Sequence, residues 1–329
     1  MKILIIQTAF IGDVVLATAL VEKLRAYYPQ AEIHFLLRSG NEGLLAGHPG
    51  IEKVWIWDKK QHKYRNLIRL LFSIRREKFE LIVNCQRFAA SGLLTAFSGA
   101  KISAGYAKNP FSFLFTNKFP HTLGHSGDAV FLHEINRNQQ LIARFTDTVP
   151  ALPALYPSVA DFDSVKKYKD EPFVTICPSS VWFTKQLPVE KWMELIMKIP
   201  ANYNIYLLGA GGDHLLCNKI MHSFPERKIS NMAGQLSFLQ TAALMKDAAM
   251  NYVNDSAPLH FASSVNANVT AVFCSTIPQF GFGPLSSVHH VLEIEGKLPC
   301  RPCGLHGFRQ CPEKHFKCAL QINMQTFLE

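Results

Sequence analysis

The feature that most constrains the fold is an alternation of short apolar runs with helical stretches, and it occurs twice along the chain. Residues 2–7 form an apolar run, residues 9–13 a turn, and residues 14–28 a helical pattern that ends at Pro29. Further strands are expected at 32–37, 54–57 and 80–85, with helices at 64–77 and 89–97. Strands that alternate with helices predict βαβ units and a parallel sheet.

A proline-rich stretch over residues 149–160 is the best linker candidate in the chain. The alternation begins again after it, with strands expected at 173–177, 204–208, 250–254 and 269–273 and helices at 189–199, 238–246 and 258–264. A further helix is expected after a turn at 209–212 and ends at His222. We therefore predict two α/β domains, residues 1–158 and 159–329, that face each other across a cleft. Ligands bind at the carboxyl ends of the strands in open α/β sheets.

The charge is uneven along the chain. The whole sequence holds 34 basic and 25 acidic residues, and residues 1–158 hold 19 and 11 of them, a net +8. Residues 159–329 hold the other 15 and 14, a net +1. A basic first half suggests a polyanionic partner (nucleic acid, an anionic membrane surface or a phosphorylated glycolipid), or else only a solubilising surface. Nucleic acid fits poorly, because few aromatic side chains suited to base stacking are interleaved with the cations.

The segment 59–78 concentrates this charge, with eight basic residues and Glu77 as its one acid. Its apolar residues are Leu67, Ile68, Leu70, Leu71, Phe72 and Ile74. A basic amphipathic helix of this kind rests on an anionic membrane surface or binds a phosphorylated lipid, or it is an ordinary surface helix with a solvated face. No uncharged, unbroken stretch reaches the ~18–20 residues of a membrane span, and the apolar run 3–6 is too short for a secretory signal, so we expect a soluble cytoplasmic protein.

Three polar clusters each follow an expected strand. Gly12-Asp13 ends the first loop, where Asp13 would be either a helix N-cap or a general base at the cleft. Residues 178–185 offer Ser179, Ser180, Thr184 and Lys185 to a phosphate, although a lone lysine is more often solvated. In residues 254–260, Asp255 or Ser256 would cap a helix or build an anion site, and His260 would be a buried histidine or a ligand. No G-x-G-x-x-G motif follows the first strand, which argues against a dinucleotide site.

The eight cysteines fall into two groups. Cys85, Cys177, Cys217 and Cys274 lie in apolar contexts and are expected to be reduced, buried thiols. Cys300, Cys303, Cys311 and Cys318 are spaced C-x2-C-x7-C-x6-C, with His306 and His315 nearby. A structural zinc site, a redox pair and unligated thiols all remain open, because this spacing fits no standard zinc template well.

Six segments together resemble the ADP-heptose:lipopolysaccharide heptosyltransferases of glycosyltransferase family 9. They are residues 12–18, 179–188, 207–213, 231–237, 254–262 and 275–278 with Gly283-Pro284. They occur in the family's order over nearly the whole chain. The cysteine-rich tail, residues 300–318, is similar to that of the heptosyltransferase II branch. Two positions depart from the family pattern, since Ala257 stands where glycine is usual and Cys177-Pro178 opens the phosphate loop.

The resemblance implies a GT-B fold, in which the N-terminal domain binds the acceptor and the C-terminal domain binds the nucleotide sugar. It implies an inverting transfer from ADP-heptose to the lipopolysaccharide inner core of a Gram-negative cell, with no metal or cofactor, by an enzyme at the inner face of the inner membrane. Asp13 matches the family's base, Lys185 its phosphate-binding lysine, and Asp255 with His260 its donor motif. The other matching substrate-binding positions are Gly12, Ser179, Ser180, Thr184, Asp213, Leu236, Ser256 and Ala257.

Two other functions are compatible with these residues. One is a different GT-B enzyme, either a transferase that uses another nucleotide sugar or a sugar-nucleotide 2-epimerase. The other is a nucleotide-sugar or lipid-binding protein without catalysis. An epimerase would turn over the donor with no acceptor present, whereas a transferase would only hydrolyse it slowly.

Overall fold

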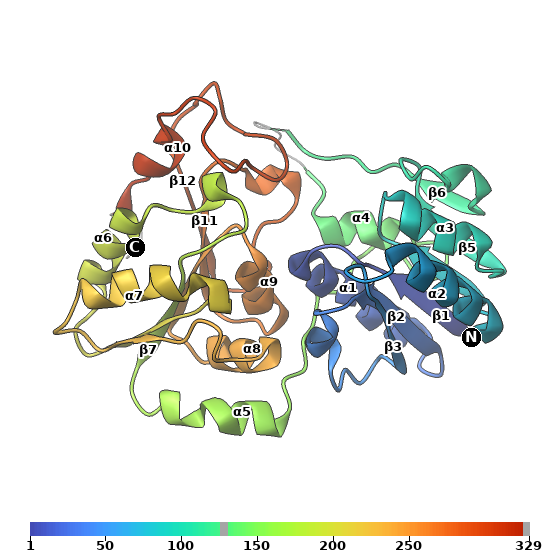
Figure 1. Cartoon of the computed structure of the whole chain (residues 1–329), viewed down its shortest axis with the longest axis horizontal. Helices are drawn as coiled ribbons and strands as arrows, with labels where there is room; N and C mark the ends of the chain where they lie inside the picture. The colour runs from blue at the N-terminus through green and yellow to red at the C-terminus, as the bar shows by residue number, and fades with distance from the viewer. Residues whose placement is uncertain (126–130, 325–329) are drawn as a thin grey trace. The chain divides into compact units, whose positions relative to one another are not determined.

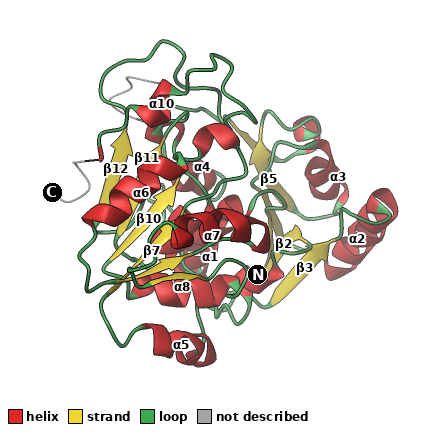
Figure 2. Ribbon diagram, turned by 60° about the vertical axis from the view of Figure 1, so that its left-hand side comes forward, coloured by secondary structure: helices red, strands yellow, loops and turns green. Residues whose placement is uncertain are grey.

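The computed structural model describes residues 1–125 and 131–324. The chain divides into two compact units, one of Met1–Leu123 with Leu132–Tyr156 and the other of Gly124–Phe131 with Pro157–Glu329. Each unit contains one parallel sheet with helices packed against its strands (Figures 1 and 2). The predicted class, α/β with two Rossmann-like parallel sheets, is confirmed.

The sheet of the first unit has the strand order β3-β2-β1-β4-β5-β6, and all of its strand pairs are parallel. Its strands are β1 (Lys2–Ile6), β2 (Glu32–Arg38), β3 (Lys53–Trp57), β4 (Leu81–Asn84), β5 (Ile102–Tyr106) and β6 (Asn117–Phe119). Its helices are α1 (Ile11–Tyr27), α2 (Lys63–Glu77), α3 (Ala89–Phe97) and α4 (Glu134–Gln140). The central strand β1 is apolar at every buried position, as expected when helices cover a parallel sheet on both faces.

The sheet of the second unit has the order β12-β11-β10-β7-β8-β9, again with parallel pairs throughout. Its strands are β7 (Phe173–Cys177), β8 (Asn204–Leu207), β9 (Ile229–Asn231), β10 (Met250–Asn254), β11 (Val269–Phe273) and β12 (His289–Glu293). Its helices are α5 (Val159–Val165), α6 (Val189–Lys198), α7 (His214–His222), α8 (Phe238–Lys246), α9 (Ala257–Ser264) and α10 (Lys317–Leu320). Trp192 of α6 is fully buried in the core of this unit, beside Ile176 of β7 and Ile220 of α7.

Both sheets have the same topology, because the first strand of each unit lies between the second strand and the fourth. In such a sheet the chain runs outward from the centre in one direction for the first three strands and in the other direction for the last three. The reversal falls between β1 and β4 in the first sheet and between β7 and β10 in the second. This switch point, at the carboxyl ends of the strands, is where doubly wound proteins bind ligands. The sequence therefore positions Asp13 after β1 and residues 178–185 and 255–260 after β7 and β10.

Several edge elements differ from the sequence-based expectation. The sequence does not predict the strands β5, β6, β9 and β12 or the helices α4, α5 and α10. Among the strands, β6 and β9 have only three residues each, and β12 begins with two exposed histidines. Helix α1 begins at Ile11, so the expected turn at 9–13 is wrong in its second half. No helix in the described part of the chain combines the length and the apolar character of a membrane span.

Candidate active site

Asp13 lies in the first turn of α1, directly beyond the carboxyl end of β1. The N-cap of this helix is Phe10, so the expectation that Asp13 caps the helix is wrong. A carboxylate in a first turn is stabilised by the positive end of the helix dipole. Its charge also reaches the end of β4, where burial, Glu134 and Asp13 together raise the pKa of the Cys85 thiol. Asp13 is half-buried at the switch point of the first sheet.

The loop that leads to Asp13 is held by side chains from two other strand ends. Lys59, just after β3, donates from Nζ to the Thr8 carbonyl oxygen at 2.7 Å and to Thr8 Oγ1 at 3.0 Å. The Thr8 hydroxyl donates to Gln86 Oε1 at 2.7 Å, just after β4. Burial, together with the charges of Arg38 and Lys63, lowers the pKa of Lys59 to about 8. The charge pattern of the sequence marks Lys59 only as part of a basic segment, although a lysine directly beyond a strand end is a signal for a site residue.

In the second unit, an ion pair joins the ends of neighbouring strands. Lys185 Nζ lies 2.7 Å from Asp255 Oδ2, and the two side chains are only 15% and 7% exposed. The Thr276 hydroxyl donates to the same carboxylate oxygen at 2.6 Å. Lys185 follows β7, Asp255 follows β10 and Thr276 follows β11, which are consecutive strands of the sheet. The reading of Lys185 as a solvated side chain is therefore wrong. Lys185 and Asp255, which were predicted as members of two separate clusters, are in direct contact.

Asn254 fixes both ends of the loop that carries Lys185. Its side-chain amide donates to the carbonyl oxygens of Pro178 at 3.0 Å and Cys177 at 3.3 Å. Its Oδ1 accepts from the backbone N–H of Leu187 at 2.9 Å. Asn254 is fully buried, so these hydrogen bonds satisfy a polar group that would otherwise be costly to bury. In the sequence Asn254 is only the first residue of the 254–262 segment, and its positioning role is visible only in the structure.

The hydroxyl groups of residues 178–185 differ in their availability. Ser179 and Ser180 are half-buried, and their hydroxyls make no hydrogen bond within the described residues. Thr184 is buried, and its Oγ1 accepts from the backbone N–H of Phe308 at 2.8 Å and from Ser275 Oγ at 3.0 Å. The two serines can therefore donate to a ligand, whereas Thr184 fastens the loop to the rest of the unit.

Helix α9 begins next to this ion pair. Its N-cap residue is Ser256, but neither Ser256 nor Asp255 makes a side-chain capping bond, so the capping reading of these residues is wrong. Ser256 Oγ donates to the Asn254 carbonyl oxygen at 3.3 Å, and Ala257 is the first helical residue. His260 lies one turn further along, is buried, and has its ring centroid 6.4 Å from that of Phe282. The first backbone N–H groups of α9 have no acceptor within the helix, as at the start of any α-helix.

Two further predicted positions lie on the same edge of the second sheet. Asp213, which follows β8, accepts the backbone N–H of Ala210 at 2.8 Å, so its carboxylate closes its own loop. Gly234 has a φ of +74°, and a Cβ there would lie 2.8 Å from the Cα of Gly211. This close approach brings the loop with Asp213 against the loop after β9 that carries the half-buried Leu236.

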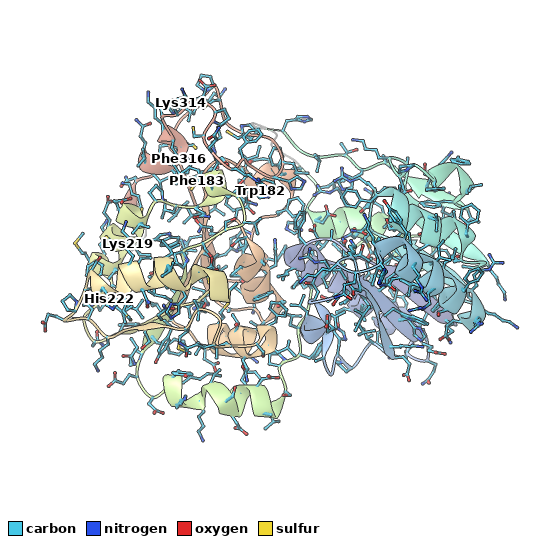
Figure 3. All side chains as sticks on the ribbon, viewed as in Figure 1. Trp182, Phe183, Lys219, His222, Lys314 and Phe316 are labelled. Atoms are coloured by element: carbon cyan, nitrogen blue, oxygen red, sulfur yellow. The ribbon has the colours of Figure 1, made fainter. Side chains whose placement is uncertain are left out.

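The C-terminal segment 300–318 packs directly on the Lys185 loop. The backbone N–H of Thr184 donates to the Phe308 carbonyl oxygen at 3.1 Å, in addition to the contact from Phe308 to the Thr184 hydroxyl. The rings of Phe183 and Phe316 have centroids 5.1 Å apart (Figure 3). The Arg301 guanidinium donates to the carbonyl oxygens of Cys274 and Thr276 at 2.8 and 2.7 Å and pairs with Glu293 at 2.6 Å. This segment therefore braces the loops after both β7 and β11.

The eight cysteines are free thiols, and the prediction that Cys85, Cys177, Cys217 and Cys274 are buried and reduced is confirmed. The four tail cysteines line one cavity of about 260 Å³ together with Glu313 and His315. Within the described residues, however, no three His, Cys, Asp or Glu side chains are placed to hold one metal ion. Burial, with the neighbouring thiols, raises the pKa of Cys318 to about 12. The structure lends the zinc reading no support.

Gly307 provides a test of how the tail positions Lys185. Its φ is +74°, and a Cβ there would lie 2.8 Å from Thr184 Oγ1 and 3.1 Å from Lys185 Cγ. Since the family resemblance implies that the Lys185 loop binds ADP, we expect Gly307→Ala to weaken ADP binding severalfold. We also expect it to lower the free energy of unfolding by about 1–3 kcal/mol, because it adds both backbone strain and a clash. Calorimetry and urea denaturation measure the two effects.

Gly304→Ala is the matched control for this variant. Gly304 also has a positive φ, +66°, but a Cβ there meets nothing within 4 Å. It shares the backbone strain without the contact to Lys185. If the two variants weaken ADP binding equally, the tail does not position the lysine.

The fold and these sites define a two-domain α/β protein with polar groups gathered at the switch point of each sheet. The family model for glycosyltransferase family 9 (heptosyltransferase) matches residues 67–307, and the chain belongs to this family. It is therefore a glycosyltransferase. Lipopolysaccharide heptosyltransferase 3 of Escherichia coli is 27% identical over 81% of this chain and 82% of its own length. Lipopolysaccharide heptosyltransferase 2 of E. coli K12 is 23% identical over 100% and 97%.

Solved structures of the family share the fold. E. coli ADP-heptose lipopolysaccharide heptosyltransferase II superposes with a TM-score of 0.80 at 20% identity, over 99% of this chain and 96% of that chain. The E. coli heptosyltransferase WaaC with ADP gives a TM-score of 0.71 at 14% identity, over 88% and 92%. These likenesses establish the two-domain architecture of this chain.

Proposed function

We propose that this protein transfers a heptose from ADP-heptose to the inner core of lipopolysaccharide, with inversion at the anomeric carbon. The observation that carries the proposal is the buried contact between Lys185 and Asp255 at the switch point of the second sheet, in a chain of the heptosyltransferase family. The relatives at 27% and 23% identity are lipopolysaccharide heptosyltransferases, and WaaC was solved with ADP and with ADP-2-deoxy-2-fluoro heptose.

Asp13 acts as the general base. Its carboxylate takes the proton of an acceptor hydroxyl while that oxygen bonds to the anomeric carbon of the donor. The bond from this carbon to the diphosphate oxygen breaks on the opposite face, and ADP leaves. One displacement of this kind inverts the configuration at the anomeric carbon.

Lys185 stabilises the negative charge that grows on the leaving diphosphate. An ammonium has three N–H donors, and the contact with Asp255 leaves others free for phosphate oxygens. The hydroxyls of Ser179 and Ser180 and the N-terminus of α9 add neutral donors on the same sheet edge. Asp255 orients the lysine, and Thr276 and Asn254 hold their respective loops.

The acceptor binds to the first unit, whose sequence range carries most of the positive charge of the chain. The inner core of lipopolysaccharide is phosphorylated, so cations at the strand ends, Lys59 among them, attract it. The enzyme works at the inner face of the inner membrane, where a lipid-linked acceptor is accessible. His260, Asp213 and Leu236 contribute to the shape of the donor site.

A transfer assay with purified full-length protein tests this proposal. ADP release from ADP-heptose is expected to require a heptose-deficient inner-core acceptor, and proton NMR of the product is expected to show the inverted anomer. Donor conversion without acceptor would instead indicate an epimerase. Binding of ADP-heptose with no turnover would indicate a non-catalytic protein. Thermal-shift measurements with other nucleotide sugars establish the donor, because the preferred ligand raises Tm most.

A further inference from the structure

Helix α2 has two separate apolar faces. Leu67, Leu70 and Ile74 are buried and pack in the core of the first unit. Tyr64, Ile68 and Phe72 are 75%, 45% and 59% exposed. Their spacing of four residues places them in one line along the helix, on the side away from the buried residues. The helix therefore presents an aromatic and aliphatic row to its surroundings, which packing within the unit does not explain.

A row of arginines lies beside this apolar row. Arg65, Arg69 and Arg76 follow it around the helix at intervals of four and seven residues, and all three are exposed. None of them takes part in the ion pairs found among the described residues. The exposed side of α2 thus combines apolar side chains with arginines that form no ion pair within the described part of the chain.

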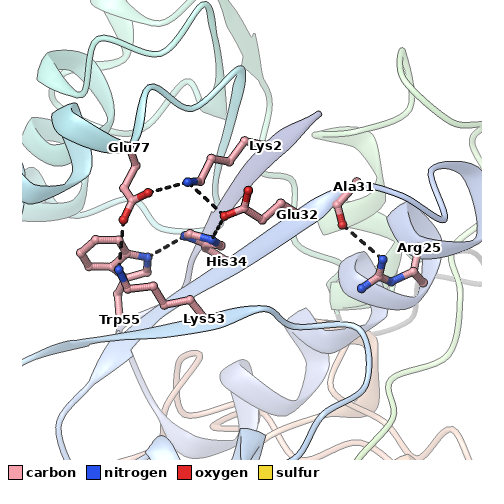
Figure 4. A network of polar contacts seen from close by, with 8 residues as sticks. All are labelled: Lys2, Arg25, Ala31, Glu32, His34, Lys53, Trp55 and Glu77. Carbon is pink, nitrogen blue, oxygen red and sulfur yellow. Dashed lines mark hydrogen bonds and ion pairs between the residues drawn. The ribbon is translucent and has the colours of Figure 1, made fainter.

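The single acid of this helix faces the other way. Glu77 pairs with Lys2 of β1 and with Lys53 of β3 (Figure 4), the latter at 3.0 Å. These pairs fasten the end of α2 to the sheet and remove the one carboxylate that could neutralise the arginines. Arg75 Nη1 also donates to the Phe97 carbonyl oxygen at 2.6 Å, at the end of α3. The Phe97 side chain is 44% exposed, so the apolar surface continues onto the neighbouring helix.

We propose that this α2 surface, formed by Tyr64, Ile68, Phe72, Arg65, Arg69 and Arg76, docks on an anionic phospholipid bilayer. Aromatic and aliphatic side chains of a surface helix insert at the boundary of headgroups and acyl chains. Arginines beside them bind lipid phosphates, and an anionic leaflet attracts such a basic segment. The uniform sign of the charge and the absence of an acid on this side match a lipid surface. The buried face of the helix stays packed on the sheet during docking.

This inference does not depend on the transfer reaction, because vesicle binding is measured without donor or acceptor. The protein is sedimented with vesicles of phosphatidylcholine alone or of phosphatidylcholine with about one third phosphatidylglycerol. The second composition supplies the anionic surface that attracts basic segments. We expect binding only to the anionic vesicles, and we expect it to weaken as salt rises, because exposed charges are screened.

Two double variants separate the contributions of the surface. Tyr64→Ser with Phe72→Ser is expected to weaken vesicle binding at least tenfold, and Arg65→Gln with Arg69→Gln is expected to do the same and to flatten the salt dependence. The substituted side chains are exposed, so the thermal unfolding of both variants should match the unsubstituted protein. Turnover with a water-soluble, delipidated acceptor should also be unchanged.

The matched control is the double variant Leu215→Ser with Lys219→Gln in α7 of the second unit. Leu215 is an exposed apolar residue, and Lys219, labelled in Figure 3, is an exposed cation four residues further along. This variant should bind vesicles as the unsubstituted protein does. Equal loss in the control, unchanged binding of both α2 variants, or no preference of the unsubstituted protein for anionic vesicles would each overturn the proposal. Failure of the transfer assay alone would leave it standing.

Discussion

Asp13→Asn is expected to lower kcat by about 10²–10⁴-fold, the usual contribution of a general base. Asparagine has the shape of aspartate but cannot accept the acceptor's proton, so the loss falls on turnover. Binding of ADP should change by less than about twofold, because Asp13 lies in the first unit and the residues that we propose to bind the nucleotide lie in the second. Stopped assays of ADP release and calorimetry with ADP measure the two quantities.

Glu52→Gln is the control for this substitution. Glu52 is an exposed acid of the same unit and directly precedes β3. It therefore lies at the amino ends of the parallel strands, whereas Asp13 lies at their carboxyl ends. It removes the same charge without touching the proposed site. Turnover of Asp13→Asn within a few-fold of the unsubstituted protein would exclude the base role. A comparable loss in Glu52→Gln would show that the effect is one of net charge.

The second large effect is expected from Lys185→Met. A hydrogen bond to a charged group contributes about 1.5–3 kcal/mol, so ADP affinity should fall by roughly 10–150-fold. The substitution also leaves Asp255 without its cation, and breaking a buried pair in this way destabilises a protein by about 3–5 kcal/mol. Calorimetry with ADP and urea denaturation report these losses separately.

The double variant Lys185→Met with Asp255→Asn separates binding from stability. Asparagine carries no charge to leave unpaired and can still accept the Thr276 hydroxyl, so most of the lost stability should return while ADP affinity stays low. Lys228→Met is the control, because Lys228 pairs with Glu171 at 2.7 Å and both side chains are about half exposed. Its effect on both measurements should be small, since exposed pairs contribute little. Restored ADP affinity in the double variant would show that Lys185 does not bind the diphosphate.

The sequence predicted the sites best where a single segment contains the whole signal. The central strands are unbroken apolar runs, and polar residues directly after them had to lie at the carboxyl edge of a parallel sheet. This reasoning placed Asp13, Lys185 and Asp255 on strand ends, and the structure brings Lys185 and Asp255 into contact. The sequence did not predict the role of a side chain whose hydrogen-bond partner lies far away along the chain. The Thr184 hydroxyl was assigned to a ligand because its partner, Phe308, lies 124 positions away.

Short edge strands were missed for a related reason. A three-residue strand such as β6 has no periodicity of its own and forms only because β5 supplies its hydrogen-bond partners. Asn254 and Arg301 were missed because an amide or a guanidinium that binds backbone carbonyl oxygens leaves no pattern in the sequence. The role of two glycines is visible only in the structure, because Gly234 and Gly307 lie where two loops come into contact.

The contact between Thr184 and Phe308 has a consequence for biosynthesis. Strand β7 and its loop leave the ribosome long before Arg301, Phe308 and Phe316 do, yet these later residues hold that loop in place. A nascent chain that has already formed both sheets would therefore still lack the contacts that hold the Lys185 loop. The Lys185 loop would reach its final conformation only after residues 301–316 have been synthesised.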